Sequence, residues 1–473
     1  MRNPAPSAET TSPLPLPSAR GLRALRLAPA LRMPAAPRSR TGRTSAARTS
    51  LDTVVGEFFP RRAALAIQEE FLVPFGIALG AAASQAGLLA SFPRLLAALA
   101  QLLTPHLQHL RGTRRVVVGS AVVGGAAFVG AASVLALPEG ARVWALMLWS
   151  ALVLVALELP NPLWGGWMGT VVPRGRRGRY MALRTSVGMP AAIGVFMLGG
   201  LFLDTFTGAV GVVAFAGLLS VGAGLQFASA WLLRRLYEPR PEPRDCSHEM
   251  AVSLRGLYTS KVGRFAAASG VLMVGSFVAA PYIAVFQLRD LGFSYLAYAF
   301  TTVVFTLSSA VALRFWGRFA DKHGDAAAIK FSTLGIIAVP LMWTLVREPW
   351  QAIPAQVISG IGWAGFNLAA MSLLAREGGR ERRMGNVAVY NALSGVGAFV
   401  GAGLGGLLLP LVSPLVTLPL VGLFYVSTGL RASAVGLVWL SLRTTQPVQT
   451  SPVVTLAPAP APDPAPVAVP EAA

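Results

Sequence analysis

The stretch Gly317-Arg318-Phe319-Ala320-Asp321-Lys322-His323-Gly324-Asp325 is a polar interruption between two long apolar runs. A connection this short predicts that the flanking runs form an antiparallel pair of helices. Gly317 would let the two helix ends approach closely, and Gly324 would allow a turn with positive φ. Asp321 would accept hydrogen bonds from backbone N–H groups at the start of a neighbouring helix. On its own, the stretch is equally consistent with an ordinary charged turn.

The composition indicates a membrane protein. The chain has 473 residues, of which 54% are hydrophobic and 13% charged, and its mean hydropathy is +0.59. Soluble domains carry about 25% charged residues, so this much apolar surface requires lipid around it. The net charge of +20 lies mainly in tails and loops without interleaved aromatic residues, which argues against nucleic-acid binding and favours contact with anionic membrane lipid.

Twelve segments are apolar and long enough to span a bilayer. Arginines and lysines gather in alternate connections between them, as expected for short cytoplasmic loops. Both termini are therefore predicted to be cytoplasmic, in a protein of the cell (inner) membrane. The segments are centred near Phe75, Ala97, Gly125, Leu152, Val195, Leu219, Met273, Val304, Ile337, Ile361, Phe399 and Leu430.

The two ends of the chain are predicted to be disordered. Residues 1–57 are rich in Pro, Ala and Arg, and residues 444–473 are rich in Pro and Ala. Three interpretations of the first segment stay open: a basic cytoplasmic tail, an organelle transit peptide, or a chain whose true start is Met33.

An internal repeat appears at a separation of 206 residues. Residues 176–182 align with residues 382–388, Asn161 aligns with Asn367, and a Gly-Gly pair at 199–200 aligns with one at 405–406. Several matches at one offset predict two six-helix halves in the same orientation. The halves are residues 58–233 and 265–443, and a cytoplasmic linker, residues 234–264, joins them.

The pattern at Gly317, Asp321, Lys322 and Gly324 resembles the signature loop of major facilitator superfamily transporters. It departs from that loop at Asp325, where the family prefers a base. The resemblance covers roughly residues 60–442. It implies an all-α integral membrane protein with twelve transmembrane helices in two pseudo-symmetric six-helix bundles. It also implies loops that act as conformational latches, with the residues Gly317, Asp321, Lys322, Gly324, Arg176, Arg177, Arg179, Arg184, Arg382 and Arg383.

In that family, helices 1, 4, 7 and 10 line a central cavity. A carboxylate inside a bilayer costs about 2.5 to 3.5 kcal/mol on insertion scales, so it usually faces a cavity or a partner. Six residues on three of these helices are therefore candidates for proton coupling or substrate binding: Glu69, Glu70, Glu158, Asn161, Trp363 and Asn367.

Glu158 is the first of these candidates. It is expected to lie well inside the hydrocarbon, where it could exchange a proton, and Pro160 and Pro162 should break the helix and free backbone carbonyls nearby. The alternative is a structural ion pair with Arg184.

Three other features have mainly structural interpretations. Glu69 and Glu70 point about 100° apart on a helix, so at most one faces the cavity, and both are expected near the cytoplasmic end. Arg431 is expected to have a structural or lipid-contacting role. The glycines of helix 5 are expected to allow close helix packing.

The sequence contains no nucleophile elbow, phosphate-binding glycine loop or set of zinc ligands. His106 and His109 lack accompanying metal ligands, and Cys246 is the only cysteine. The chain is therefore not expected to be an enzyme or to hold a metal or cofactor. The prediction is a monomeric secondary transporter that moves a small-molecule substrate by alternating access. Coupling to protons and export of an amphipathic compound are favoured. The alternative is a membrane sensor or scaffold that keeps the same fold without transporting.

Overall fold

The computed structural model describes residues 43–103, 112–161, 163, 172, 177–206, 208–235, 260–376, 379–412 and 418–443. Contacts divide the chain into residues 1–48 and residues 49–473, and the packing described below lies within the second unit. In the described ranges, every regular element is a helix.

Six membrane helices precede the linker region. They are α1 (Arg43–Ala78), α2 (Ala83–Gln101), α4 (Thr113–Ala132), α5 (Glu139–Glu158), α7 (Arg177–Asp204) and α8 (Gly208–Leu233). A short 3-10 helix, η3 (Ser133–Ala136), extends α4.

Six further spans follow the linker region. The first consists of α10 (Lys261–Phe277), α11 (Ala280–Val285) and the π-helix η5 (Phe286–Asp290). The others are α12 (Tyr295–His323), α13 (Asp325–Trp343), α14 (Ala352–Arg376) with the 3-10 helix η6 (Pro349–Gln351) before it, α15 (Gly379–Val412) and α16 (Pro419–Leu442).

The twelve predicted spans are confirmed, because each predicted centre falls in a different one of them. Ten of the described spans meet a length and hydropathy criterion for crossing a membrane. The other two, α1 and α2, carry more polar residues and pack into the same unit.

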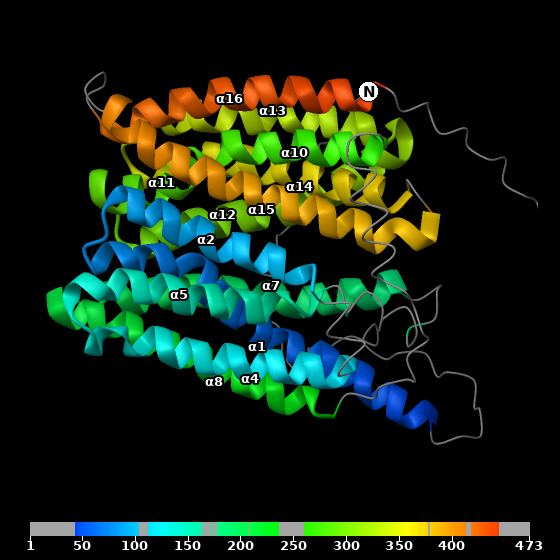
Figure 1. Ribbon diagram of the computed structural model, residues 1–473, viewed down its shortest axis with the longest axis horizontal. Helices are drawn as coiled ribbons and strands as arrows, with labels where there is room; N and C mark the ends of the chain where they lie inside the picture. Colours follow the sequence, from blue (N-terminus) through cyan, green and yellow to red (C-terminus); the bar gives the residue numbers. More distant parts are fainter. Residues whose placement is uncertain are drawn as a thin grey trace, which may run out of the picture. The chain divides into compact units, whose positions relative to one another are not determined.

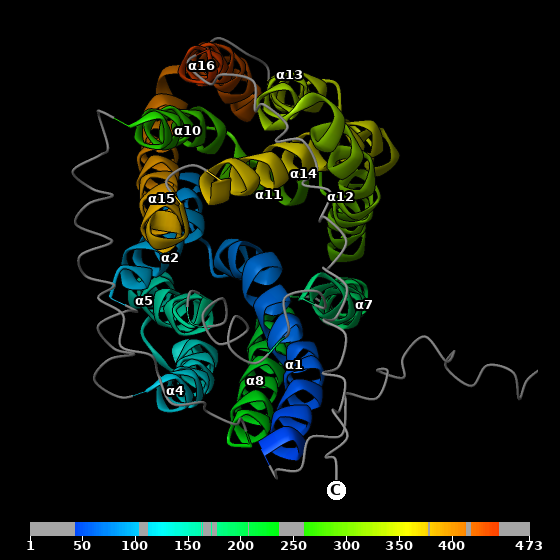
Figure 2. The same cartoon turned by 90° about the vertical axis from the view of Figure 1, so that its right-hand side faces the viewer.

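The helices form two bundles, each with a buried core of its own, and two further apolar clusters span the interface between them. One contains α1 to α8 and the other α10 to α16 (Figure 1, Figure 2). Phe71, Phe128 and Phe215 belong to the core of the first bundle, and Phe265 and Trp316 belong to the core of the second. The bundles meet mainly where α2 packs on α15 and where α7 packs on α12.

The predicted disordered tail extended too far. Helix α1 begins at Arg43, and Val54 is fully buried beside Val116 and Val117 of α4. This apolar contact, together with a buried bond from Ser229 to Glu57, holds the segment against the bundle. Likewise, the end of the predicted linker is helical, because α10 begins at Lys261. Residues 1–42, 236–259 and 444–473 lie outside the described ranges.

The polar stretch at 317–325 is almost entirely helical, so the predicted loop is wrong. Helix α12 continues to His323 and α13 starts at Asp325, which leaves Gly324 as the whole connection. Gly324 has φ +88°, as predicted for the turn. Gly317 does not mediate close helix packing, because a β-carbon placed on it would have no neighbour within 4 Å.

A glycine seam joins α10 to α15. Its three glycines lie four residues apart on α15, and each faces a carbonyl group of the first span of the second bundle too closely to allow a side chain. The facing pairs are Gly397 with Gly270, Gly401 with Val274, and Gly405 with Val278. Close packing is also found for two glycines of α7, since Gly188 lies against the Phe58 ring and Gly199 against the Phe71 ring, whereas a β-carbon placed on Gly194 would have no neighbour within 4 Å.

Candidate functional site

Glu158 was expected to lie well inside the hydrocarbon, and the structure places it at the C-terminal end of a helix. It is the last residue of α5, nineteen residues after Glu139, and Pro160 follows it in a turn. Because proline lacks an N–H group, it prevents continuation of the helix and frees a carbonyl one turn earlier. The carbonyl oxygen of Leu157, in the last turn of α5, accepts a hydrogen bond from Arg61 Nη2.

Asn161 connects Glu158 to a buried base. Arg61 Nη2 of α1 donates to Asn161 Oδ1 over 2.8 Å, and Asn161 Nδ2 donates to Glu158 Oε2 over 2.6 Å. Glu158 is thus bonded to Asn161, in contrast to the expected alternative of an ion pair with Arg184. Arg184 instead stacks over the Phe58 ring, 4.1 Å from its centroid.

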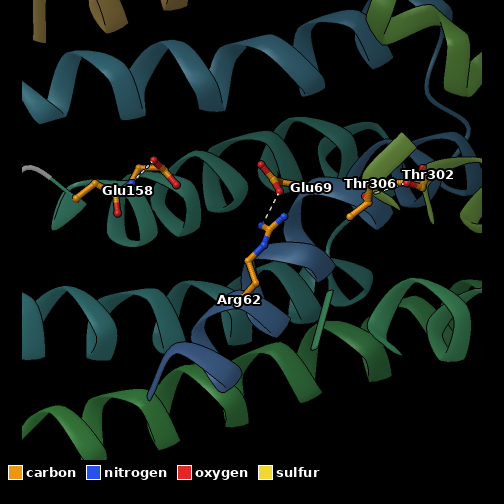
Figure 3. A network of polar contacts seen from close by, with 6 residues as sticks. Arg62, Glu69, Glu158, Thr302 and Thr306 are labelled. Atoms are coloured by element: carbon orange, nitrogen blue, oxygen red, sulfur yellow. Dashed lines mark hydrogen bonds and ion pairs between the residues drawn. The ribbon is translucent and has the colours of Figure 1, made fainter. Parts of the chain in front are cut away.

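Glu69 forms an ion pair along one face of α1. Its Oε2 lies 3.1 Å from Arg62 Nη1, two helical turns away, and the side chains are 32% and 28% exposed. Figure 3 shows this pair between Glu158 and Thr302. Glu158 is within electrostatic reach of Arg61, Glu69, Arg94 and Arg62.

Glu70 points away from Glu69, as the helical geometry predicted. It is 6% exposed, and its Oε1 accepts a hydrogen bond of 2.5 Å from Thr302 Oγ1 of α12. Thr302 is one turn from Thr306, whose hydroxyl donates to the Thr302 carbonyl (Figure 3). Both acids lie in the second half of α1, which starts at Arg43. A buried carboxylate of the first bundle therefore bonds directly to the second.

A pocket opens between α1, α2 and α5 beside Glu69. Its polar lining residues are Gln68, Glu69 and Arg94, and its apolar lining residues are Leu72, Val73, Ala90, Pro93 and Leu154. Sequence reasoning missed Arg61, Arg62, Arg94 and Thr302 as site residues. The signal for Arg94 was present, because it is the only charged residue of α2.

The two candidates on α14 do not join the acids of the first bundle. Trp363 is half-buried, with its ring edge against Phe366, and Asn367 is exposed one turn further along. In the described part of the chain, neither has a hydrogen bond to Glu69, Glu70 or Glu158.

In the polar stretch at residues 317–325, the buried acid is Asp325 and not Asp321. Asp321 and Lys322 are exposed in the last turn of α12. Asp325 is 9% exposed, accepts a hydrogen bond of 3.0 Å from Ser372 Oγ and lies 3.5 Å from Arg376 Nε. The position that departs from the family pattern thus makes the contact with α14.

The other predicted latch residues are only partly described. Arg177 and Arg179 lie in the first turn of α7, and Arg382 and Arg383 lie near the start of α15. The structure describes the backbone of these four residues but not their side chains. Arg176, His106 and His109 lie outside the described ranges altogether.

Side chains also join the bundles at two opposite ends. Asp204, the last residue of α7, accepts hydrogen bonds from backbone N–H groups at the start of α12. Asn391 Nδ2 of α15 donates to Gln101 Oε1, at the end of α2, over 3.1 Å. Because consecutive spans alternate in direction, Asp204 and Gln101 lie at opposite ends of the bundles.

A family model described as Major Facilitator Superfamily matches residues 63–262 and 265–467. The chain is also similar to two curated proteins called multidrug resistance protein MdtG. The protein from Serratia proteamaculans is 31% identical over 102 residues, which are 22% of this chain and 25% of the relative. The protein from Dickeya zeae is 33% identical over 109 residues, 22% of this chain and 26% of the relative. The matched part spans about a quarter of the length of these relatives.

Solved structures show the same fold. The nucleoside transporter NupG has a TM-score of 0.66 and 12% identity, with 84% of this chain and 99% of that chain covered. A D-xylose-proton symporter has a TM-score of 0.61 and 14% identity, with 83% and 97% covered. At such identities the likeness shows two six-helix bundles and leaves the solute undetermined.

Proposed function

Because the chain belongs to the Major Facilitator Superfamily, we propose that this integral membrane protein is a secondary transporter of a small solute. It would work as a monomer in the cell (inner) membrane, with both termini cytoplasmic. The observation that carries the proposal is the bond between Glu70 of one bundle and Thr302 of the other. It links an ionisable group directly to the contact that alternating access must break.

Alternating access requires two bodies that move against each other. The core that each bundle has of its own supports this, because it can stay packed while the clusters that span the interface rearrange. The contacts of Asp204 with α12 and of Asn391 with Gln101 lie at opposite ends, so each is placed to open and close one side.

Proton coupling is proposed through carboxylates of the first bundle. A carboxylate that is buried in one state and hydrated in another changes its proton affinity between the two states. Glu70 fits this description because its only side-chain partner in the described part is a hydroxyl across the bundle interface. Glu158 is proposed as the second coupling group, since Asn161 connects it to Arg61.

The proposed direction of transport is export, and the proposed substrate is an amphipathic compound. The pocket beside Glu69 has five apolar lining residues and three polar ones, which suits a ligand with both characters. The partial similarity to proteins named for multidrug resistance is in keeping with this.

Transport in proteoliposomes tests the proposal. The purified full chain is reconstituted with an imposed pH gradient and offered a library of labelled solutes. We expect gradient-driven movement of at least one solute, with loss of pH dependence in Glu70→Gln and Glu158→Gln. Glu139→Gln is the matched control, because Glu139 is an exposed acid at the opposite end of α5.

Each outcome decides a separate question. If no solute moves under any gradient, the sensor or scaffold alternative replaces transport. If Glu158→Gln moves solute with unchanged pH dependence, Glu158 is not a coupling group, and the same holds for Glu70→Gln and Glu70.

A further inference from the structure

We propose that Arg94 holds the negative charge of the substrate, and that the substrate class is an amphipathic organic monoanion. The inference rests on the proposed transport function and specifies its ligand. It is based on three observations: the place of Arg94 in α2, the partners of the surrounding charges, and the lining of the pocket.

Arg94 lies in the interior of an otherwise uncharged helix. It is the twelfth of the nineteen residues of α2, and its side chain is exposed to the pocket shared with Glu69. A charged side chain within a membrane span costs about 2.5 to 3.5 kcal/mol on insertion scales, so it normally faces a partner or a water-filled cavity. In the described part of the chain, Arg94 has no hydrogen bond and no ion pair.

The neighbouring charges already have partners. Glu69 is paired with Arg62. Glu158 is bonded to Asn161, which is bonded to Arg61. Among the three bases within electrostatic reach of Glu158, which are Arg61, Arg62 and Arg94, only the Arg94 guanidinium has no bonded partner in the described part of the chain. A ligand that pairs with this guanidinium would be an anion.

The pocket around this guanidinium sets the shape of the ligand. Leu72 and Val73 of α1, Ala90 and Pro93 of α2 and Leu154 of α5 form an apolar lining. A guanidinium binds a carboxylate, phosphonate or sulfonate through two parallel hydrogen bonds. Glu69 lines the same pocket and repels a second negative charge, which favours a single charge on an apolar body.

Equilibrium binding of three probes that share a naphthalene ring and differ in charge tests the assignment. Purified full-length protein in lipid nanodiscs is titrated with radiolabelled 2-naphthoate, neutral 2-naphthamide and cationic 2-naphthylmethylammonium. Wild type should bind naphthoate about tenfold more tightly than the amide, a preference typical of one charge-assisted contact. Arg94→Gln should remove this preference, and Arg94→Lys, which keeps the charge but not the two-point geometry, should retain part of it.

Arg314→Gln is the matched control, because Arg314 is an exposed arginine in the span α12. It should leave naphthoate binding unchanged. Equal binding of naphthoate and amide by wild type, tighter binding of the ammonium probe, or an unchanged preference in Arg94→Gln would each overturn the assignment. If Arg94→Gln does not fold, as judged by size-exclusion chromatography, the wild-type ranking and Arg94→Lys still decide it.

Failure of this inference is separable from failure of the proposed function. Binding needs no movement of solute, so an Arg94-dependent preference without transport would support the anion site and reject the transporter. Transport of naphthoate that is unaltered in Arg94→Gln would reject the anion site and support the transporter.

Discussion

Asp204 caps the start of α12 through Tyr295: its Oδ1 accepts the Tyr295 N–H over 2.7 Å, while its Oδ2 accepts the Leu296 N–H over 2.9 Å. The capping side chain comes from the other bundle. One turn earlier, a β-carbon on Gly200 would lie 2.8 Å from the Tyr295 carbonyl oxygen, so the backbones of α7 and α12 are already in contact. This carboxylate is therefore positioned to stabilise the closed arrangement at one end of the interface.

Replacing Asp204 with Asn should open this end more often. Asparagine keeps one acceptor oxygen but replaces the other with an NH2 group, so one of the two hydrogen bonds is lost, at a cost of about 1 kcal/mol or roughly a fivefold change in an opening equilibrium. The measurement is the rate of thiol labelling at Ala299→Cys, a fully buried position of α12, in a Cys246→Ser background. Asp290→Asn, at an exposed acid, is the control. Equal labelling in Asp204→Asn and wild type would show that the cap does not stabilise closure.

Thr302→Val should destabilise the protein more than Thr306→Val. The first change removes the donor to the buried Glu70 carboxylate, and an unsatisfied buried acceptor costs about 1 to 3 kcal/mol. The second removes only a bond within α12. Thermal unfolding of both variants, with a double-mutant cycle between Glu70→Gln and Thr302→Val, measures the coupling. Additive effects in the cycle would contradict a direct bond.

Asp325→Asn and Arg376→Gln should have non-additive effects on stability, because their side chains form one contact. Arg376 is largely exposed, so we expect about 1 kcal/mol or less from the pair itself.

Asp321→Asn should leave the stability of this conformation unchanged, because Asp321 is exposed. If the latch prediction for Asp321 is right, that variant slows exchange between states, which spin-label distance measurements across the bundles would detect.

Arg431→Ala should lower thermal stability without altering ligand binding. The Arg431 side chain is 3% exposed and donates to the carbonyls of Ile336 (2.8 Å) and Ser276 (3.2 Å), in two neighbouring helices. Hydrogen bonds from a charged donor contribute about 1.5 to 3 kcal/mol, and truncation also leaves a cavity. Unfolding temperature in detergent measures the loss. Retention of wild-type stability would mean that water or other groups replace the arginine.

Gly401→Ala should separate α10 from α15, because the added methyl group would meet the Val274 carbonyl. Overpacking of this kind costs about 1 to 3 kcal/mol. Gly403→Ala is the control on the same helix, since nothing lies within 4 Å of a β-carbon there. Equal unfolding temperatures for the two variants would contradict the close contact.

The fold was predictable because lipid imposes a simple rule on the chain. Most of each span had to be apolar, so hydropathy is clear for ten of them and weaker for α1 and α2, and Gly324 was recognised as the turn residue. The residues at which the helices begin and end were harder to predict from the sequence. The start of α1 at Arg43 depends on Val54 packing against α4, a contact that no local pattern reveals.

The site was predicted less completely. A carboxylate in an apolar run is conspicuous, which is why Glu69, Glu70 and Glu158 were identified. Their partners depend on which helix faces which: Thr302 is an ordinary residue in sequence and becomes significant only because α12 packs near α1. Arg61 was overlooked because its partner Asn161 is 100 residues away in sequence, so no local pattern reveals the contact.

The ionisable groups of the site belong almost entirely to one bundle, and the second contributes the Thr302 hydroxyl. Under the proposed mechanism, the residues that select the cargo are therefore encoded in the first half of the gene. Substitutions after residue 260 could then change how α12 packs against α7 while leaving the solute-binding side chains intact.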